Sequence, residues 1–374
     1  MKITMLPFAK KTAAALALSL VASAPVLAQS QQVLNFYNWS DYIAEDTINK
    51  FEKETGIKVN FDVFDSSELL EAKLLAGNSG YDLVVTPATI IKRHIEAGVY
   101  LPLDKQKLPN IKHMHQTFMS TAATQDAGNK HAMPYLWGTT GIGINVDMVK
   151  KVLGEDAPLD SWDLVFKPEN MKKLASCGVS FLDTADEVYS VALNYLGKSG
   201  NSDNKSDYQK NSETAQLLKE IRPYVKQFNS SAYVNNLANG NICVAVGYSG
   251  DVLQAKSRAL EVNNGINIEY FIPKEGTSAW IDVLAIPNDA KNSAAAHQFV
   301  NFLMRPEIIA DITNYVTYAN ANTSATKLVD PEIARNLAIY PNEETMKSLF
   351  TNGQRTKKIN KLITRFWSHL KTGS

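Results

Sequence analysis

Residues 33–97 read VLNFYNWSDYIAEDTINKFEKETGIKVNFDVFDSSELLEAKLLAGNSGYDLVVTPATIIKRHIEA and decide the fold class. Their apolar residues follow first the period of a strand and then that of a helix, three times in succession. This pattern predicts strands at 33–39, 57–63 and 82–85 and helices at 46–53, 66–77 and 90–97. Since the elements alternate, the segment indicates a parallel sheet covered by helices.

The turn after the first strand, Asn38 to Tyr42, is a candidate binding segment on topology alone. Ligands of parallel α/β sheets bind at the carboxyl ends of the strands.

The remainder of the chain continues the α/β pattern. We expect strands at 141–146, 178–182, 242–246, 266–272 and 280–286. We expect helices at 147–153, 186–196, 213–221 and 294–303, another after Pro306, and a basic helical tail at 346–370. A single core stops growing at about 250–300 residues. The 374 residues therefore predict an α/β protein of two lobes.

The first 28 residues have the pattern of a cleaved secretory signal peptide. Lys2, Lys10 and Lys11 precede an apolar run from Ala13 to Ala22, and small residues lead to a cleavage point after Ala28. The run is too short for a membrane anchor, because a spanning helix needs about 20 apolar residues. We therefore expect an exported protein without stable membrane insertion.

Composition and charge exclude other classes of protein. With 45% hydrophobic and 20% charged residues, the chain has the composition of a folded domain. Its 38 basic residues equal its 38 acidic ones, so no basic excess predicts binding to nucleic acid. Loss of the three leader lysines would leave a formal charge of −3.

The chain has two cysteines: Cys177 precedes the expected strand at 178–182, and Cys243 lies inside the expected strand at 242–246. In an oxidising compartment two thiols of one chain more often pair than stay free. Buried free thiols are also common core residues, so two separate thiols remain an alternative at this point.

Catalytic and cofactor motifs are weak or absent in the sequence. There is no phosphate-binding GxxxxGK[ST] and no HExxH, and Gly141-Ile142-Gly143 lacks the third glycine of a dinucleotide fingerprint. His113 and His115 lack nearby metal-ligating partners, which favours a solvated loop. We expect no enzyme activity, no metal and no cofactor.

Aromatic and acidic residues gather where predicted strands end or helices begin. They are Trp39, Ser40, Asp41, Tyr42, Glu187, Tyr248, Asp251, Trp280, Asp282 and Tyr318. Aromatic faces attract an ammonium group and carboxylates neutralise it, so this combination suits a dehydrated organic cation. Singly, each residue also has an ordinary explanation, as core for Trp39 and Trp280 or as a helix cap for Asp41 and Asp251.

Long stretches of the sequence resemble periplasmic polyamine-binding proteins of ATP-binding-cassette importers, most closely the putrescine-binding members. They are YNWSDYIAEDTINKFEKETGIKV (37–59), FDVFDSSELLEAKLLAG (61–77), MPYLWGTTGIGINVD (133–147), DSWDLVFKPENMKKLASCGVSFLD (160–183), LANGNICVAVGYSGDV (237–252) and YANANTSAT (318–326). The resemblance implies the type II periplasmic-binding-protein fold, in which two α/β lobes are joined by hinge crossover strands. It places one lobe at 29–137 plus 272–315 and the other at 138–271 plus 316–374.

The resemblance also implies roles for the candidate residues. Trp39, Ser40, Asp41 and Tyr42 would form part of the ligand wall. Glu187, Asp251 and Asp282 would meet the ammonium groups, and Tyr248, Trp280 and Tyr318 would line the methylene chain. A disulfide between Cys177 and Cys243 is implied as well. The expected partners are putrescine or spermidine and a membrane permease, for a periplasmic monomer that releases its ligand to the transporter.

The chain departs from the putrescine binders at three places. Thr86-Pro87-Ala88-Thr89 replaces a serine-bearing loop, Tyr248 stands where many members have Trp, and Trp280 stands where putrescine binders often have Phe. Spermidine binders have Trp there, so spermidine is the second ligand after putrescine. Two other functions stay open: a secreted glycoside hydrolase with Glu187 and Asp251 as paired acids, and delivery of ligand to a chemoreceptor.

Overall fold

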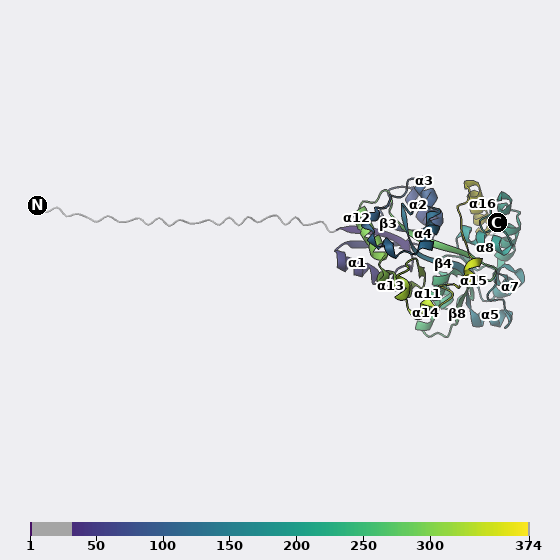
Figure 1. The fold of residues 1–374 in the computed structure, drawn as a ribbon. Helices are drawn as coiled ribbons and strands as arrows, with labels where there is room; N and C mark the ends of the chain where they lie inside the picture. Colours follow the sequence, from purple (N-terminus) through teal and green to yellow (C-terminus); the bar gives the residue numbers. More distant parts are fainter. Residues whose placement is uncertain (2–31, 373–374) are drawn as a thin grey trace. The chain divides into compact units, whose positions relative to one another are not determined.

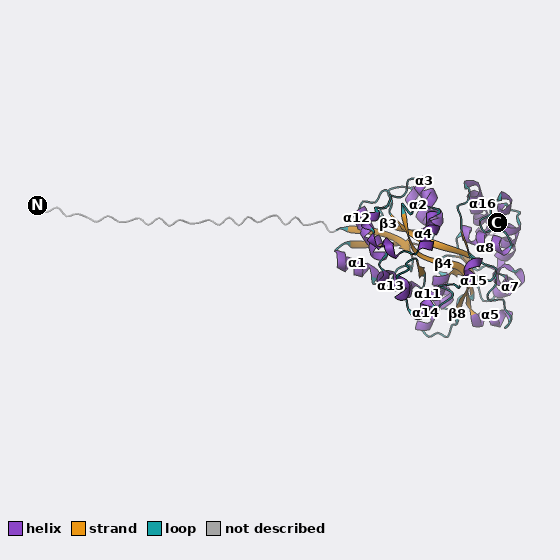
Figure 2. Cartoon of the chain, viewed as in Figure 1, coloured by secondary structure: helices purple, strands orange, loops and turns teal. Residues whose placement is uncertain are grey.

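The computed structural model describes Met1 and residues 32–372. The predicted signal peptide, residues 1–28, lies outside the described residues apart from Met1. Figures 1 and 2 display strands at the centre of the folded unit, with helices packed around them. No helix in this described part is long and apolar enough to cross a membrane.

The N-terminal segment has the predicted order of strands and helices. It comprises β1 (Val33–Trp39), α1 (Thr47–Thr55), β2 (Lys58–Phe64), α2 (Ser67–Leu75), β3 (Leu83–Pro87) and α3 (Ala88–Glu96). β1 pairs in parallel with both β2 and β3, as the alternation requires. α1 ends at Gly56, whose φ of 73° is the left-handed conformation that glycine adopts at least cost.

A long strand, β4 (Ala132–Asn145), connects two groups of strands and is buried along its whole length. Its first half pairs with β9 (Ser278–Ala285), which in turn pairs with β3. Its second half pairs with β7 (Val244–Tyr248) and β8 (Ile268–Phe271), and β7 pairs with β5 (Val179–Phe181). The strand order is β2-β1-β3-β9-β4-β7-β5-β6, where β6 is Gln227–Phe228.

Two short strands complete the sheet: β10 (Ala319–Asn320) pairs with β4, and β11 (Phe350–Thr351) pairs with β9. β4 changes partner between Thr139, which pairs with β9, and Thr140, which pairs with Tyr248 of β7. The predicted division between lobes, at 137/138, lies close to this point and stays a prediction.

Helices cover the sheet on the remaining segments. They are α4 (Gln116–Ala123), α5 (Val146–Leu153), α6 (Asp163–Phe166), α7 (Pro168–Leu174), α8 (Ala185–Tyr195), α9 (Glu213–Ile221), α10 (Tyr233–Ala238), α11 (Ser249–Glu261), α12 (Ser293–Leu303), α13 (Pro306–Val316), α14 (Pro331–Ala334), α15 (Glu343–Ser348) and α16 (Lys357–Thr372). Most expected bounds agree with these to within two residues.

Two predictions of secondary structure were wrong. The strand expected at 141–146 begins at residue 132, because its first half is a continuous buried run without strand alternation. The tail expected as one helix at 346–370 is divided into α15, β11 and α16. Pairing of Phe350 with Ser278 of β9 draws this segment into the sheet and away from a helical path.

The two cysteines form a disulfide, as the resemblance implied. Cys177 follows α7, and Cys243 immediately precedes β7, with a Cα–Cα distance of 5.5 Å. The neighbouring strands β5 and β7 run in parallel with Val179 opposite Val244, which brings the two sulfurs together. The bond closes a sequence separation of 66 residues, a constraint worth about 4 kcal/mol on the chain-entropy model.

Candidate functional site

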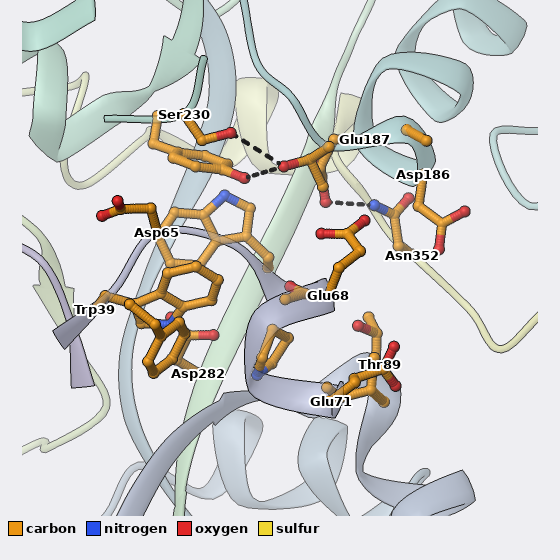
Figure 3. Close-up of a pocket in the computed structure, with 18 of the residues that line it drawn as sticks. Trp39, Asp65, Glu68, Glu71, Thr89, Asp186, Glu187, Ser230, Asp282 and Asn352 are labelled. Atoms are coloured by element: carbon orange, nitrogen blue, oxygen red, sulfur yellow. Dashed lines mark hydrogen bonds between the residues drawn. The ribbon is translucent and has the colours of Figure 1, made fainter. Parts of the chain in front are cut away.

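A cavity of about 420 Å³ lies where the strand ends of the two groups meet, and Figure 3 displays part of its lining. All ten residues singled out in the sequence line this one cavity. They come from five separate segments of the sequence, so only folding brings them together. The turn after β1, the end of β7 and the middle of β9 supply most of them.

Aromatic rings form one continuous side of the cavity. The Trp280 ring lies 5.4 Å from both the Tyr248 and the Tyr318 ring centroids, at interplanar angles of 80° and 62°. Tyr42 continues the series with a centroid 5.1 Å from that of Tyr318. Edge-to-face contacts of this kind hold each ring at a fixed angle. The cavity therefore offers rigid aromatic faces to an apolar or cationic ligand.

Two glycines allow these rings to pack so closely. A Cβ at Gly138 would lie 2.9 Å from the Trp280 ring, and one at Gly250 would lie 2.5 Å from the Tyr318 ring. Real Cβ contacts are not that short, so any other residue at either position would displace an aromatic wall. Sequence reasoning missed both glycines, because nothing in their neighbourhood along the chain indicates the ring above them.

Asp251, in the first turn of α11, is held by two tyrosines. Its carboxylate accepts hydrogen bonds from the Tyr233 hydroxyl at 2.8 Å and the Tyr318 hydroxyl at 2.6 Å. Burial raises the pKa of Asp251 to about 6, although both tyrosine hydroxyls favour its charged form. A cation beside this carboxylate would lower that pKa again and hold the group ionised.

Asp282, in β9, is the most deeply buried of the cavity's predicted carboxylates, with 5% of its surface exposed. Burial raises its pKa to about 7, against the opposing influence of Tyr42 and Trp39. The Tyr42 hydroxyl and the Trp39 indole N–H complete no hydrogen bond with any group in the described part of the chain. The negative charge of Asp282 is therefore buried without completed hydrogen bonds from these two donors. An ammonium group beside it would stabilise that charge.

Glu187, in α8, accepts hydrogen bonds from three neutral side chains. Its carboxylate accepts hydrogen bonds from Thr140 Oγ1 at 2.9 Å, Ser278 Oγ at 2.6 Å and Asn352 Nδ2 at 2.7 Å. Figure 3 shows the contact with Asn352. Burial raises the pKa of Glu187, and these three donors oppose the increase. The three hydrogen bonds therefore hold the Glu187 carboxylate in one orientation within the cavity.

Asn352 is a cavity residue that sequence reasoning missed. It follows β11, is 8% exposed, and presents an amide oxygen without a partner among residues 32–372. The residue was hidden by the expectation of a continuous helix at 346–370. Because the amide nitrogen is bound to Glu187, the free oxygen and the Glu187 carboxylate form a pair of neighbouring acceptors.

Ser40 and Asp41 occupy the rim of the cavity. The Ser40 hydroxyl donates to Asp65 at 2.8 Å, and the exposed Asp41 carboxylate pairs with Arg258 of α11 at 3.1 Å. The Asp41–Arg258 pair joins the turn after β1 to the helix after β7. Of the departures noted in the 86–89 loop, Pro87 and Thr89 line the cavity, whereas Thr86 is buried.

Two arginines also line the cavity, which the sequence did not predict. Arg93 bonds to Glu71, and Arg355 pairs with Asp186 at 3.1 Å while donating to Ser190 and the Gly200 carbonyl. Both positive charges are therefore already neutralised. Within the described ranges, no group of three His, Cys, Asp or Glu residues is placed to hold a metal ion.

The fold and the cavity define a two-lobed solute-binding protein with the type II periplasmic-binding-protein fold. The model of the bacterial extracellular solute-binding protein family matches residues 46–341. The chain belongs to this family.

Individual relatives agree with this assignment. The chain is 53% identical to the putrescine-binding periplasmic protein of Escherichia coli K12, over 95% of each chain. It is also 53% identical to a putrescine-binding periplasmic protein of Pseudomonas aeruginosa, over 96% of this chain and 97% of the relative. Among solved structures, a spermidine/putrescine ABC transporter substrate-binding protein of Streptococcus pneumoniae superposes with a TM-score of 0.73 at 29% identity, over 91% of this chain and 99% of that one.

Proposed function

We propose that this protein is the periplasmic binding component of a polyamine importer, which binds putrescine in the cavity and delivers it to a membrane permease. The observation that carries the proposal is the pairing of rigid aromatic walls with Glu187, Asp251 and Asp282, in a cavity whose arginines are already neutralised. An alkyl diammonium ion has the complementary chemistry, since its methylenes pack on rings and its charged ends meet carboxylates.

Each ammonium end would meet a different chemical environment. Asp282 gains most from an ammonium group, because it is buried with incomplete compensation of its charge. Asp251 is presented by the hydroxyls of Tyr233 and Tyr318, so its carboxylate is held at a fixed angle. The methylene chain would lie against Trp280 and its neighbouring tyrosines. No step of this mechanism makes or breaks a covalent bond.

Binding would favour a closed arrangement of the two strand groups. Trp39 ends β1 and Asp41 follows it, whereas Asp251 follows β7 and Glu187 follows β5, so one ligand would contact both groups. A ligand shifts an equilibrium by its differential affinity for the two states. Contacts from both sides exist only when the groups are close, which is how a diammonium ion would stabilise the closed form.

Spermidine is the second candidate ligand, and two observations favour it. Trp280 supplies a larger aromatic face than phenylalanine would, and its indole N–H has no partner in the described chain. Asn352 presents a buried, unpartnered amide oxygen beside Glu187. A third amine could donate to that oxygen. Putrescine remains first because the relatives of 53% identity are putrescine-binding proteins.

The periplasmic location rests on the signal-peptide pattern of residues 1–28 and on the names of the relatives. The same evidence favours a transport protein over a secreted glycoside hydrolase.

Calorimetric titration with putrescine, spermidine and cadaverine tests the proposal. We expect at least putrescine or spermidine to bind tightly with one-to-one stoichiometry and to raise the melting temperature. Absence of both heat and thermal shift with all three polyamines would exclude the proposed function. The ratio of putrescine to spermidine affinity decides between the two ligands.

A further inference from the structure

A second concavity of the molecule lies between α9 and α16, outside the ligand cavity. This groove has a volume of about 920 Å³. Its floor is apolar and includes Leu362 and the buried ring of Phe366. Its charged lining is basic throughout: Lys210, Lys219, Arg222, Arg365 and His369.

Only some of the basic side chains of the groove interact with the rest of the described chain. Arg222 donates to the carbonyls of Leu370 and Lys371 and so supports the end of α16. In contrast, the exposed side chains of Lys210 and Arg365 make no ion pair or hydrogen bond with any described residue. α16 itself, KKINKLITRFWSHLKT, contains no acidic residue. The basic surface is therefore unbalanced in a chain whose acidic and basic residues are equal in number.

The groove and the ligand cavity share one helix. Asn360, Ile363 and Thr364 of α16 line the ligand cavity, whereas Leu362, Arg365 and Phe366 line the groove. The end of α16 is also tied to the segment before α8, since Trp367 Nε1 and Lys371 Nζ both donate to Asp183 at 2.8 Å. Glu187 lies four residues beyond Asp183, so a contact in the groove would act on an element that borders the ligand. Figure 1 shows α16 beside α8.

We propose that the groove between α9 and α16 docks an acidic, amphipathic segment of the membrane permease, an inference that rests on the proposed function. Apolar side chains of such a segment would pack on the half-buried Leu362, while its carboxylates would meet Lys210 and Arg365. A concave surface with an apolar floor fits a protein segment better than a flat layer of lipid headgroups.

The test separates docking from ligand binding by charge reversal at two exposed groove residues. Cells lacking their own binding protein would produce either the wild-type protein or the variant Lys210→Glu/Arg365→Glu. We expect uptake of labelled putrescine to fall about tenfold or more, because reversed charges repel an acidic segment. Calorimetric affinity for putrescine should stay within about twofold, since neither side chain lines the ligand cavity.

The control is Lys151→Glu/Lys291→Glu, which makes the same charge change at exposed lysines outside the groove. Unchanged uptake by the groove variant, or an equal loss in the control, would overturn the proposal. Co-sedimentation with phosphatidylglycerol vesicles that is lost only in the groove variant would overturn it in favour of an anionic lipid surface. Calorimetry of the wild-type protein tests the proposed function separately, because absence of polyamine binding would exclude that function. Docking itself is measured as binding of the wild-type and groove-variant proteins to the permease complex in nanodiscs, and equal binding of the two would overturn the docking proposal.

Discussion

Two carboxylates of the cavity, Asp282 and Glu187, are compensated in opposite ways. Asp282 is almost fully buried, and the two donors that face it complete no hydrogen bond in the described structure. Glu187 receives three hydrogen bonds from neutral side chains. On the proposed function, Asp282 would depend on the ligand for compensation of its charge, whereas Glu187 would be oriented before the ligand arrives. Sequence position alone does not distinguish these two roles.

Asp282→Asn should have the largest effect, because it would leave a ligand ammonium buried without its counter-charge. We expect putrescine affinity to fall roughly 150- to 5,000-fold, the range that corresponds to about 3–5 kcal/mol for breaking a buried pair. The affinities of the wild type and the variant are measured by calorimetric titration at pH 8. The control is Asp330→Asn, an exposed position outside the cavity. Unchanged affinity would mean that no ammonium group lies at Asp282.

Putrescine affinity should next depend on pH between about 5 and 7. Burial raises the pKa of Asp282 to about 7 and that of Asp251 to about 6, so the empty cavity holds protons that a dication must displace. Affinity should therefore fall as the pH is lowered, by about tenfold per pH unit for each carboxyl that binds a proton. Titrations in buffers of different ionisation enthalpy would detect the released protons; a flat profile would contradict these assignments.

The stability of the empty protein should show the opposite dependence. Both acids have a folded-state pKa above the unfolded value, so the folded state binds more protons between about pH 4 and pH 7. Their contribution to the free energy of unfolding is present below about pH 4 and is lost as the pH rises through the folded pKa values. The measurement is the melting temperature of the wild type and of Asp282→Asn as a function of pH. An equal dependence of melting temperature on pH in both proteins would contradict the contribution of Asp282.

Asn352→Leu should change selectivity rather than overall binding. It removes the unpartnered amide oxygen and one of the donors to Glu187, so we expect spermidine affinity to fall roughly tenfold, the value of one charge-assisted hydrogen bond. Putrescine affinity should change less than about threefold. Asn352→Gln is the matched control, because it keeps both polar groups. Equal losses for both ligands would place Asn352 in a structural role.

The smallest effect is expected at the rim. Asp41→Asn removes the ion pair with Arg258 that joins the two strand groups across the cavity. Both side chains are partly exposed, so such a pair contributes about 0.2–1 kcal/mol and affinity should fall less than about fivefold. The difference from wild type should disappear at high salt. A loss as large as that of Asp282→Asn would instead place Asp41 in direct contact with the ligand.

Much of the site could be predicted because its chemistry is local in the sequence. Trp39 to Tyr42 form one continuous turn, and Tyr248 and Asp251 lie within four residues of each other at a strand end. Asn352 could not be found in this way, since it reaches the cavity only because β11 pairs with β9 across more than 70 residues of sequence. Gly138 and Gly250 were missed for a similar reason, as the rings that require them come from distant segments.

The sequence by itself determined the α/β alternation, the segments that carry aromatic and acidic groups, and the signal-peptide pattern, because each depends on residues close together in the chain. Tertiary structure alone decided the unequal compensation of Asp282 and Glu187, the neutralisation of both cavity arginines and the basic groove beside α16. These properties depend on burial and on partners from distant segments. Electrostatic energy is set by distance and solvent access in space, which the order of residues does not specify.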